Sequence, residues 1–148
     1  IGSFKDGGFF PNSYTQKWKT NKKRRDINIF FQKNKVYKLL QSPEEKEWGR
    51  ISFRKLRGYS DPLTSFLKLI YNFEESLTID GRRVYTISLE KNLEKNKKIY
   101  TIKDYKNIWA DHKRNDLKQI TIIHETNNNL PHAIFINYKE QTFKIEKN

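Results

Sequence analysis

One helix signal stands in a chain whose other segments read as short β-strands. At residues 60–71, Asp61 is placed to cap a helix, and Pro62 follows at the first helical position, where its missing amide proton is not needed. The apolar residues after it have helical spacing: Leu63, Phe66, Leu67 and Ile70. Such a stripe needs an apolar surface to cover it, for example a sheet or the mouth of a barrel. The sequence therefore predicts one short helix, near residues 61–71, that plugs or covers a β-container.

Short stretches of alternating apolar and polar residues, typical of half-buried strands, make up most of the remaining chain. Two turns are well marked: Lys33-Asn34, and Asp80-Gly81, which accepts the positive φ angles of a two-residue hairpin. The expected strands are 27–31, 35–40, 50–54, 77–79, 82–89, 98–103, 108–110, 118–124, 132–138 and an edge strand with Phe143 and Ile145. Without β-α-β alternation, this pattern predicts a mainly β fold, an antiparallel barrel or sandwich formed by residues 1–148 as a single domain.

The last predicted hairpin also allows a prediction of register. If its loop is centred on Asn128, Ile122 faces Ile134, Ile120 faces Ile136, and His124 faces His132. The two histidines are then the sharpest candidate for a metal or acid–base site, although these positions also suit the polar end of a strand pair. The remaining histidine, His112, lies in a polar turn and is expected at the surface.

Composition and motifs exclude several classes of function. The chain has no cysteine, so it has no disulfide, thiolate metal site or cysteine nucleophile. It has no run of about 18 apolar residues, the length that a transmembrane helix needs. Catalytic and phosphate-binding motifs are absent from the sequence, so we expect no enzymatic activity, no cofactor and no metal. No feature of the sequence indicates an oligomeric state.

The formal net charge of +13 invites a nucleic-acid hypothesis. Apart from residues 22–25 and a lysine-rich stretch at 91–98, however, the basic residues are scattered singly at alternating positions, as on a solvated face. This distribution disfavours nucleic acid as a partner. The alternative function that it leaves is a basic surface, centred on residues 22–25, that binds a polyanion such as nucleic acid or lipopolysaccharide, or an anionic membrane.

Aromatic residues make up 14% of the chain and occur in nearly every predicted strand. A barrel of eight or more strands has interior room for a ligand, and aromatic walls suit an apolar one. We therefore predict that a small hydrophobic or amphipathic molecule binds inside the barrel, and the positive charge favours an anionic amphiphile. The expected contact residues are Phe31, Leu67, Tyr71, Tyr85, Tyr100, Trp109 and Phe135. A barrel filled by its own side chains would instead be a structural envelope module without a pocket.

Several short motifs, in this order, resemble a group of exported bacterial proteins that share a domain of unknown function. They are Gly8-Phe9-Phe10-Pro11-Asn12-Ser13-Tyr14, Ile27-Asn28-Ile29-Phe30-Phe31, Asp61-Pro62-Leu63-Thr64, Asp80-Gly81 with Tyr85, Ile108-Trp109 and Leu130-Pro131. The chain is also similar to the calycin or lipocalin superfamily, although it lacks that superfamily's G-x-W signature. The resemblance implies a secreted or periplasmic binding protein whose fold is an antiparallel up-and-down, lipocalin-like β-barrel. Because the chain starts at Ile1 and has no methionine, we expect that a segment such as a cleaved secretion signal preceded it.

Overall fold

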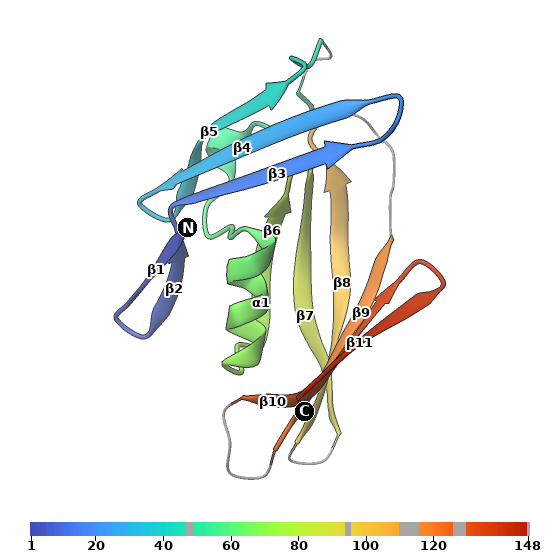
Figure 1. Cartoon of the computed structure of the whole chain (residues 1–148). Coiled ribbons are helices and arrows are strands. Elements are labelled where there is room, and N and C mark those ends of the chain that lie inside the picture. The colour runs from blue at the N-terminus through green and yellow to red at the C-terminus, as the bar shows by residue number, and fades with distance from the viewer. Residues whose placement is uncertain (47–48, 94–95, 110–115, 126–129, 148) are drawn as a thin grey trace.

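The structure is a computed structural model that describes residues 1–46, 49–93, 96–109, 116–125 and 130–147. Strands dominate, and the named strands pair antiparallel (Figure 1). The elements are β1 (Gly2–Lys5), β2 (Gly8–Pro11), β3 (Ser13–Lys19), β4 (Arg24–Gln32), β5 (Lys35–Ser42), the short 3₁₀ helix η1 (Phe53–Lys55), α1 (Pro62–Ile70), β6 (Glu75–Asp80), β7 (Arg83–Leu93), β8 (Lys97–Asn107), β9 (Leu117–His124), β10 (Pro131–Tyr138) and β11 (Gln141–Glu146). The predicted mainly β, antiparallel fold with one short α-helix is confirmed.

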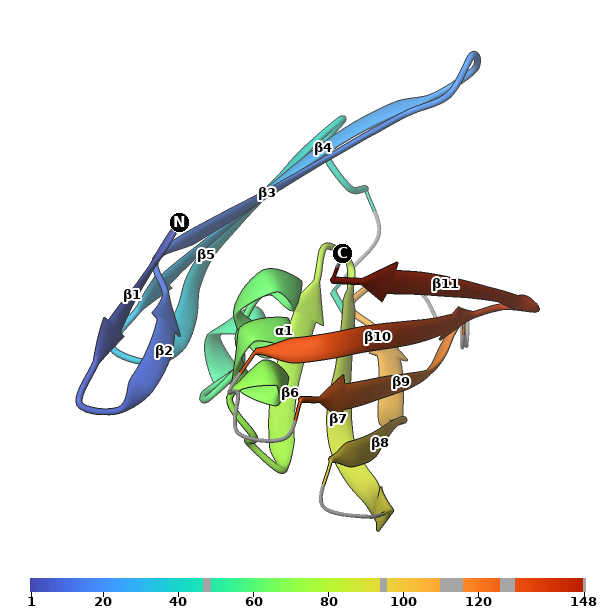
Figure 2. The same cartoon turned by 60° about the horizontal axis from the view of Figure 1, so that its bottom comes forward.

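These strands form three sheets. β1 and β2 form a hairpin, β3–β5 form a three-stranded sheet, and β6–β11 form a six-stranded sheet in chain order. β6 and β11 lie at opposite edges of the large sheet, so no sheet among the described residues closes on itself and the predicted closed barrel is not confirmed. Instead, the six-stranded sheet curls around α1, as Figures 1 and 2 show from two directions.

The helix begins where its capping signal predicts. The Asp61 carboxylate accepts hydrogen bonds from the backbone amides of Leu63 and Thr64, at 3.0 and 3.2 Å, and Pro62 is the first helical residue. Asp61 also accepts a 2.6 Å hydrogen bond from the Thr64 hydroxyl. The helix therefore starts with its free amides satisfied inside the fold.

The prediction that the apolar stripe of α1 is buried is wrong for half of that stripe. Leu63 is 68% exposed and Leu67 42% exposed, whereas Ser65 and Leu69 are fully buried. The Ser65 hydroxyl accepts hydrogen bonds from the hydroxyls of Ser76 and Thr78, at 3.0 and 2.8 Å. Small hydroxyl side chains thus bring the helix close to β6, and this rotation leaves the leucines facing outward.

Three local predictions need correction. Asp80 pairs with Arg83, so the turn consists of Gly81 and Arg82, with Gly81 in the left-handed region at φ +59°. Residues 53–55 form the 3₁₀ helix η1 in place of the strand expected at 50–54. Ile108 and Trp109 belong to no strand. Ala110 and His112 lie outside the described residues.

Two apolar clusters occupy opposite faces of β6 and β7, because successive side chains of a strand point to opposite faces. On one face, the three-stranded sheet covers a closed core that consists of Ile27, Ile29, Phe31, Val36, Leu56, Ile79, Val84 and Ile108. On the other face, α1 packs on the six-stranded sheet through Leu69. We call the apolar residues of β7–β11 on this side the open face: Tyr85, Ile87, Leu89, Tyr100, Ile102, Ile120, Ile122, Ile134, Ile136, Phe143 and Ile145.

Candidate ligand-binding hollow

The open face becomes more exposed from β8 towards β11. Tyr100 pairs with Ile120, Ile120 with Ile136, and Ile136 with Phe143, so these four side chains share one face of the sheet. Tyr100 and Ile120 are buried, whereas Phe143 is 51% exposed. In the next row, Ile145, which pairs with Ile134, is 54% exposed. The helix thus covers one part of a continuous apolar surface and leaves the other part open.

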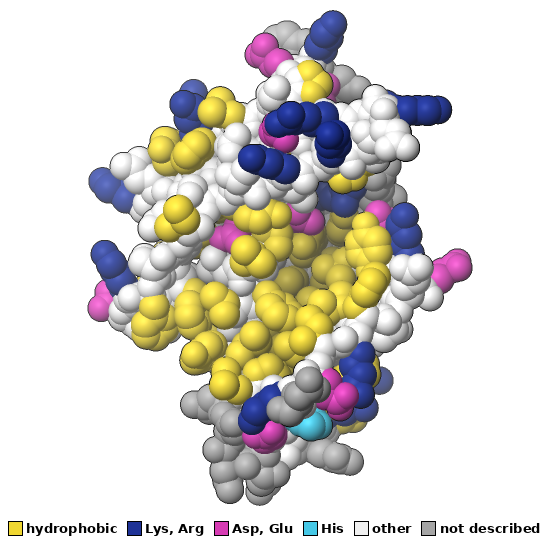
Figure 3. Space-filling view, in the orientation of Figure 1, with side chains coloured by type: hydrophobic (Ala, Val, Ile, Leu, Met, Phe, Trp, Pro, Cys, Tyr) yellow, Lys and Arg dark blue, Asp and Glu magenta, His cyan; other side chains and the backbone are white. Residues whose placement is uncertain are grey.

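A second apolar wall lies on the far side of the helix. The β1–β2 hairpin, the start of β3 and α1 enclose a cleft of about 500 Å³, a volume typical of sites for small molecules. Its apolar lining is Ile1, Phe4, Phe9, Phe10, Tyr14, Leu63 and Leu67. In Figure 3, hydrophobic side chains form a hollow that runs from the hairpin across α1 to the six-stranded sheet. The exposed leucines of α1 therefore lie within a larger apolar surface.

A polar group borders the open face at the start of β7. Arg83 lies two residues before Tyr85, on the same face of the strand, and its guanidinium interacts with the hydroxyls of Tyr105 and Tyr138. The rings of Tyr85 and Tyr105 stack with centroids 5.4 Å apart. Tyr138 also donates a 3.2 Å hydrogen bond to Asp116. One cation and three tyrosines therefore lie beside an otherwise apolar surface.

Asp80 balances part of this charge. It pairs with Arg83 across the β6–β7 turn and accepts a 3.0 Å hydrogen bond from the Gln16 side chain. Burial raises the pKa of Asp80, although Arg83 and Gln16 oppose the shift. Burial opposes the charge of Arg83 as well, but the neighbouring Tyr105 and Asp80 raise the net pKa of its guanidinium. Arg83 therefore stays cationic. An anion that approaches it competes with the carboxylate of Asp80, whose charged form is destabilised by burial.

Four of the seven predicted contact residues lie in or under the hollow. Leu67 lines the cleft beside the hairpin, and Tyr71, 49% exposed at the end of α1, packs its ring on Phe9 with centroids 5.0 Å apart. Tyr85 and Tyr100 belong to the open face but are buried beneath the helix. The Tyr100 hydroxyl donates a 3.4 Å hydrogen bond to the carbonyl of Leu69.

The structure does not bring the other three together with these four. Phe31 is part of the closed core and borders a separate cleft beside the β1–β2 hairpin. Trp109 packs against the closed core, with the Arg82 guanidinium 5.0 Å from its ring centroid. Phe135 alternates with Ile134 and Ile136 and so lies on the opposite face of β10.

Several residues of the hollow were not among the predicted contact residues. Phe143 and Ile145 were expected only as an edge strand, and Arg83 and Phe4 were not singled out. The signal for Phe143 and Ile145 was available, because the two-residue turn Lys139-Glu140 places them opposite Ile136 and Ile134.

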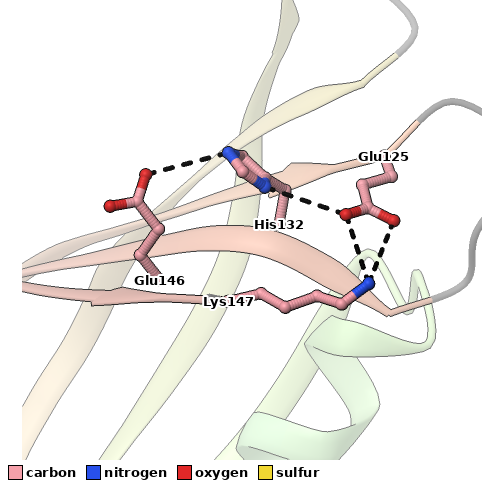
Figure 4. Close-up of polar contacts among 4 residues, drawn as sticks. All are labelled: Glu125, His132, Glu146 and Lys147. Atoms are coloured by element: carbon pink, nitrogen blue, oxygen red, sulfur yellow. Dashed lines mark hydrogen bonds and ion pairs between the residues drawn. The ribbon is translucent and has the colours of Figure 1, made fainter.

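The predicted histidine pair does not form. The expected pairings of Ile122 with Ile134 and of Ile120 with Ile136 are confirmed, but an irregularity between Pro131 and Ala133 places Pro131, not His132, opposite His124. His132 is exposed, with its ring nitrogens 3.8 and 3.7 Å from Glu125 and Glu146 (Figure 4).

Lysines engage both of these carboxylates. Lys147 contacts Glu125 at 3.3 and 3.4 Å (Figure 4), and a hydrogen bond from Lys144 lowers the pKa of Glu146. In the described part of the chain, no group of three or more His, Asp or Glu side chains is placed to hold a metal ion.

Comparisons of the chain with family models, curated proteins and solved structures find no match. The resemblance to exported bacterial proteins therefore stays a prediction. Over the residues that the structure describes, no helix has the length and apolar character needed to span a membrane.

Proposed function

We propose that the protein binds a small hydrophobic or amphipathic molecule in the hollow formed by α1, the β1–β2 hairpin and the open face. The observation that carries this proposal is the apolar surface left exposed on both sides of the helix, at Leu63 and Leu67 and at Phe143 and Ile145. Contiguous exposed apolar patches mark binding sites more often than chance. The protein is then a lipocalin-like carrier or sensor in which α1 and the β1–β2 hairpin, rather than a closed barrel, complete the site, and it acts by binding and not by catalysis.

The driving force for binding is the removal of apolar surface from water. Each 100 Å² of buried apolar area contributes about 2.5 kcal/mol before the cost of immobilising the ligand. An alkyl chain laid along the open face covers the exposed side chains of β11. Leu63 and Leu67 line the adjoining cleft, so a ligand that extends past α1 desolvates them as well.

The charge of the protein favours an amphiphile with an anionic head. Arg83 provides a cation at the border of the apolar surface, and the hydroxyls of Tyr105 and Tyr138 interact with it. A carboxylate or phosphate there accepts charge-assisted hydrogen bonds while its tail lies on the open face. We extend the proposal to location, because a carrier of this kind suits a secreted or periplasmic protein.

Native mass spectrometry of the protein as purified from cells, followed by organic extraction, tests the proposal. A bound species of lipid-like mass is the expected result. In parallel, the delipidated protein is titrated with a fluorescent fatty acid. An empty protein that also fails to bind the fatty acid would contradict the proposal and favour a structural module without a pocket.

A pair of leucine variants locates the site. Leu67 on α1 and Leu40 on β5 are exposed to similar extents, 42% and 45%, but Leu40 does not line the hollow. Leu67→Glu places a charge against the expected tail and should weaken fatty-acid binding by about tenfold or more. Leu40→Glu should leave the affinity unchanged. Equal affinities of the two variants would show that the fatty acid binds elsewhere.

A further inference from the structure

A basic arm extends from the three-stranded sheet. It comprises residues 17–25, the end of β3, the connecting turn and the start of β4, and it contains six basic residues and no acidic one: Lys17, Lys19, Lys22, Lys23, Arg24 and Arg25. Figure 2 shows its tip reaching beyond the rest of the molecule. Trp18, on the same arm, is 49% exposed.

The arm is an ordered hairpin. Lys17 pairs with Asp26, Trp18 with Arg25, and Lys19 with Arg24. At the tip, the backbone amides of Lys22 and Lys23 donate to the Thr20 hydroxyl at 3.3 and 3.1 Å, and the Thr20 amide donates to the Lys23 carbonyl at 2.7 Å. The basic side chains are therefore presented on a defined scaffold.

This arrangement costs stability in the isolated protein. Lys19 and Arg24 lie directly opposite each other, and like charges at such positions repel. Asp26, which Arg24 contacts at 2.9 Å, is the one acidic residue in the described pairings of the arm. An anionic surface placed against the arm would relieve this repulsion.

The single aromatic residue of the arm, Trp18, favours a lipid surface over single-stranded nucleic acid as the anionic partner. Single-stranded nucleic acids are bound by several aromatic platforms, on which successive bases stack. The arm has a single aromatic residue, beside basic side chains. Tryptophan with flanking lysines and arginines is typical of the boundary between lipid headgroups and acyl chains.

We infer that the basic arm docks the protein on an anionic lipid surface, with Trp18 entering the interface. Each basic residue near such a surface strengthens binding by roughly fivefold, so three or four of the six that reach the surface suffice for reversible attachment. The inference goes beyond amphiphile binding and does not rest on it, because the arm and the hollow share none of the residues named for each. If both proposals hold, the arm brings the hollow to a source of amphiphiles.

Vesicle co-sedimentation tests the inference with two variants of equal net charge. The first is Lys19→Glu/Lys22→Glu/Lys23→Glu in the arm, and the second is Lys38→Glu/Lys55→Glu/Lys118→Glu, at exposed positions outside it. We expect the wild type and the second variant to bind phosphatidylcholine vesicles only when phosphatidylglycerol is added. The arm variant should bind the mixed vesicles about 100-fold more weakly, because three lysines that each contribute roughly fivefold are lost.

Further measurements keep the inference falsifiable if the arm variant does not fold. Raising the salt from about 0.1 to about 1 M should release the wild type, because the Debye length falls from about 10 to about 3 Å. The Trp18→Phe variant should lack most of the fluorescence blue shift that the wild type shows on mixed vesicles. Equal losses in both charge variants, salt-resistant binding, an unchanged blue shift, or tighter binding of the arm to DNA than to mixed vesicles would overturn the inference.

Discussion

The closed core and the open face are built from the same kinds of side chain, but only the closed core is completely covered. In the closed core, β3–β5 pack on Ile79 and Val84, and all eight core side chains are buried. On the open face, the nine-residue helix α1 covers the β7–β10 side and leaves Phe143 and Ile145 exposed. A sheet can cover a sheet, whereas a single short helix cannot. The difference indicates that one cluster holds the fold together, while the other has apolar surface to offer a ligand.

The largest expected effect is on stability in the closed core. Ile79→Ala removes a fully buried side chain and should lower the free energy of unfolding by about 2–5 kcal/mol. Ile145→Ala, at the exposed end of the open face, should change it by less than about 0.5 kcal/mol. Urea unfolding followed by circular dichroism measures both. Similar losses would mean that the open face is part of the core and not a binding surface.

The helix cap should give the next largest effect. Asp61→Ala removes the acceptor for the amides of Leu63 and Thr64, so the free energy of unfolding should fall by about 1–2 kcal/mol. Asp61→Asn keeps an acceptor oxygen and should recover most of that loss. Because α1 forms the wall between the cleft and the open face, Asp61→Ala should also weaken fatty-acid binding. If Asp61→Ala destabilises the protein but leaves fatty-acid binding unaltered, then α1 is not part of the binding site.

Asp80 should make stability depend on pH in the acid range. Since burial raises its pKa in the folded protein, the folded state holds this proton more tightly than the unfolded state does. As the pH rises from about 4 through the raised pKa, the contribution of Asp80 to the free energy of unfolding therefore decreases. The wild type should lose stability relative to Asp80→Asn over this window, measured by urea unfolding at several pH values. If the difference in the free energy of unfolding between the wild type and Asp80→Asn does not change with pH, or grows in favour of the wild type, the raised pKa of Asp80 is contradicted.

A variant of Phe143 should show the smallest effect on stability but a clear effect on fatty-acid binding. Phe143→Ser replaces a half-exposed ring at the edge strand and should change the free energy of unfolding by less than about 0.5 kcal/mol. The same variant removes apolar surface from the hollow and should weaken fatty-acid binding several-fold. If affinity is unaffected, the ligand does not reach β11.

Local signals in the sequence were sufficient to predict many elements of the fold. The Asp61-Pro62 pair marks the start of α1, and the Lys33-Asn34 turn, in which both residues have positive φ, marks the β4–β5 hairpin. The expected centre of the loop between β9 and β10, at Asn128, predicted the pairing of Ile122 with Ile134. Each of these features depends on residues close in the chain or on the period of one strand.

Two of the mistaken predictions, the buried stripe of α1 and the histidine pair, depend on contacts between distant segments. The periodicity of α1 shows that Leu63 and Leu67 form a stripe, but hydrogen bonds from Ser76 and Thr78 to Ser65 decide which side of the helix meets the sheet. The irregularity at His132 accompanies a bond from the backbone amide of Lys147, in the chain segment after β11, to the His132 carbonyl. No local pattern encodes either contact.

The candidate site was predictable only in part for the same reason. Alternation assigns Phe135 and Ile134 to opposite faces of β10, but it does not say which face receives a ligand. Whether Phe143 is covered depends on closure of the sheet, which is a property of all six strands. Leu67 and Tyr71 were predicted as contact residues because they lie on the helix, and they do border the hollow.

Methyl NMR with a spin-labelled fatty acid tests the contrast between the two clusters most directly. If the amphiphile binds in the hollow, the label should broaden the methyl signals of Leu63, Leu67 and Ile145, and those of Ile29, Val36 and Ile79 should keep their intensity. Broadening of both sets alike, or of neither at a concentration that saturates the fluorescence titration, would contradict the assignment of the open face as the ligand-binding surface.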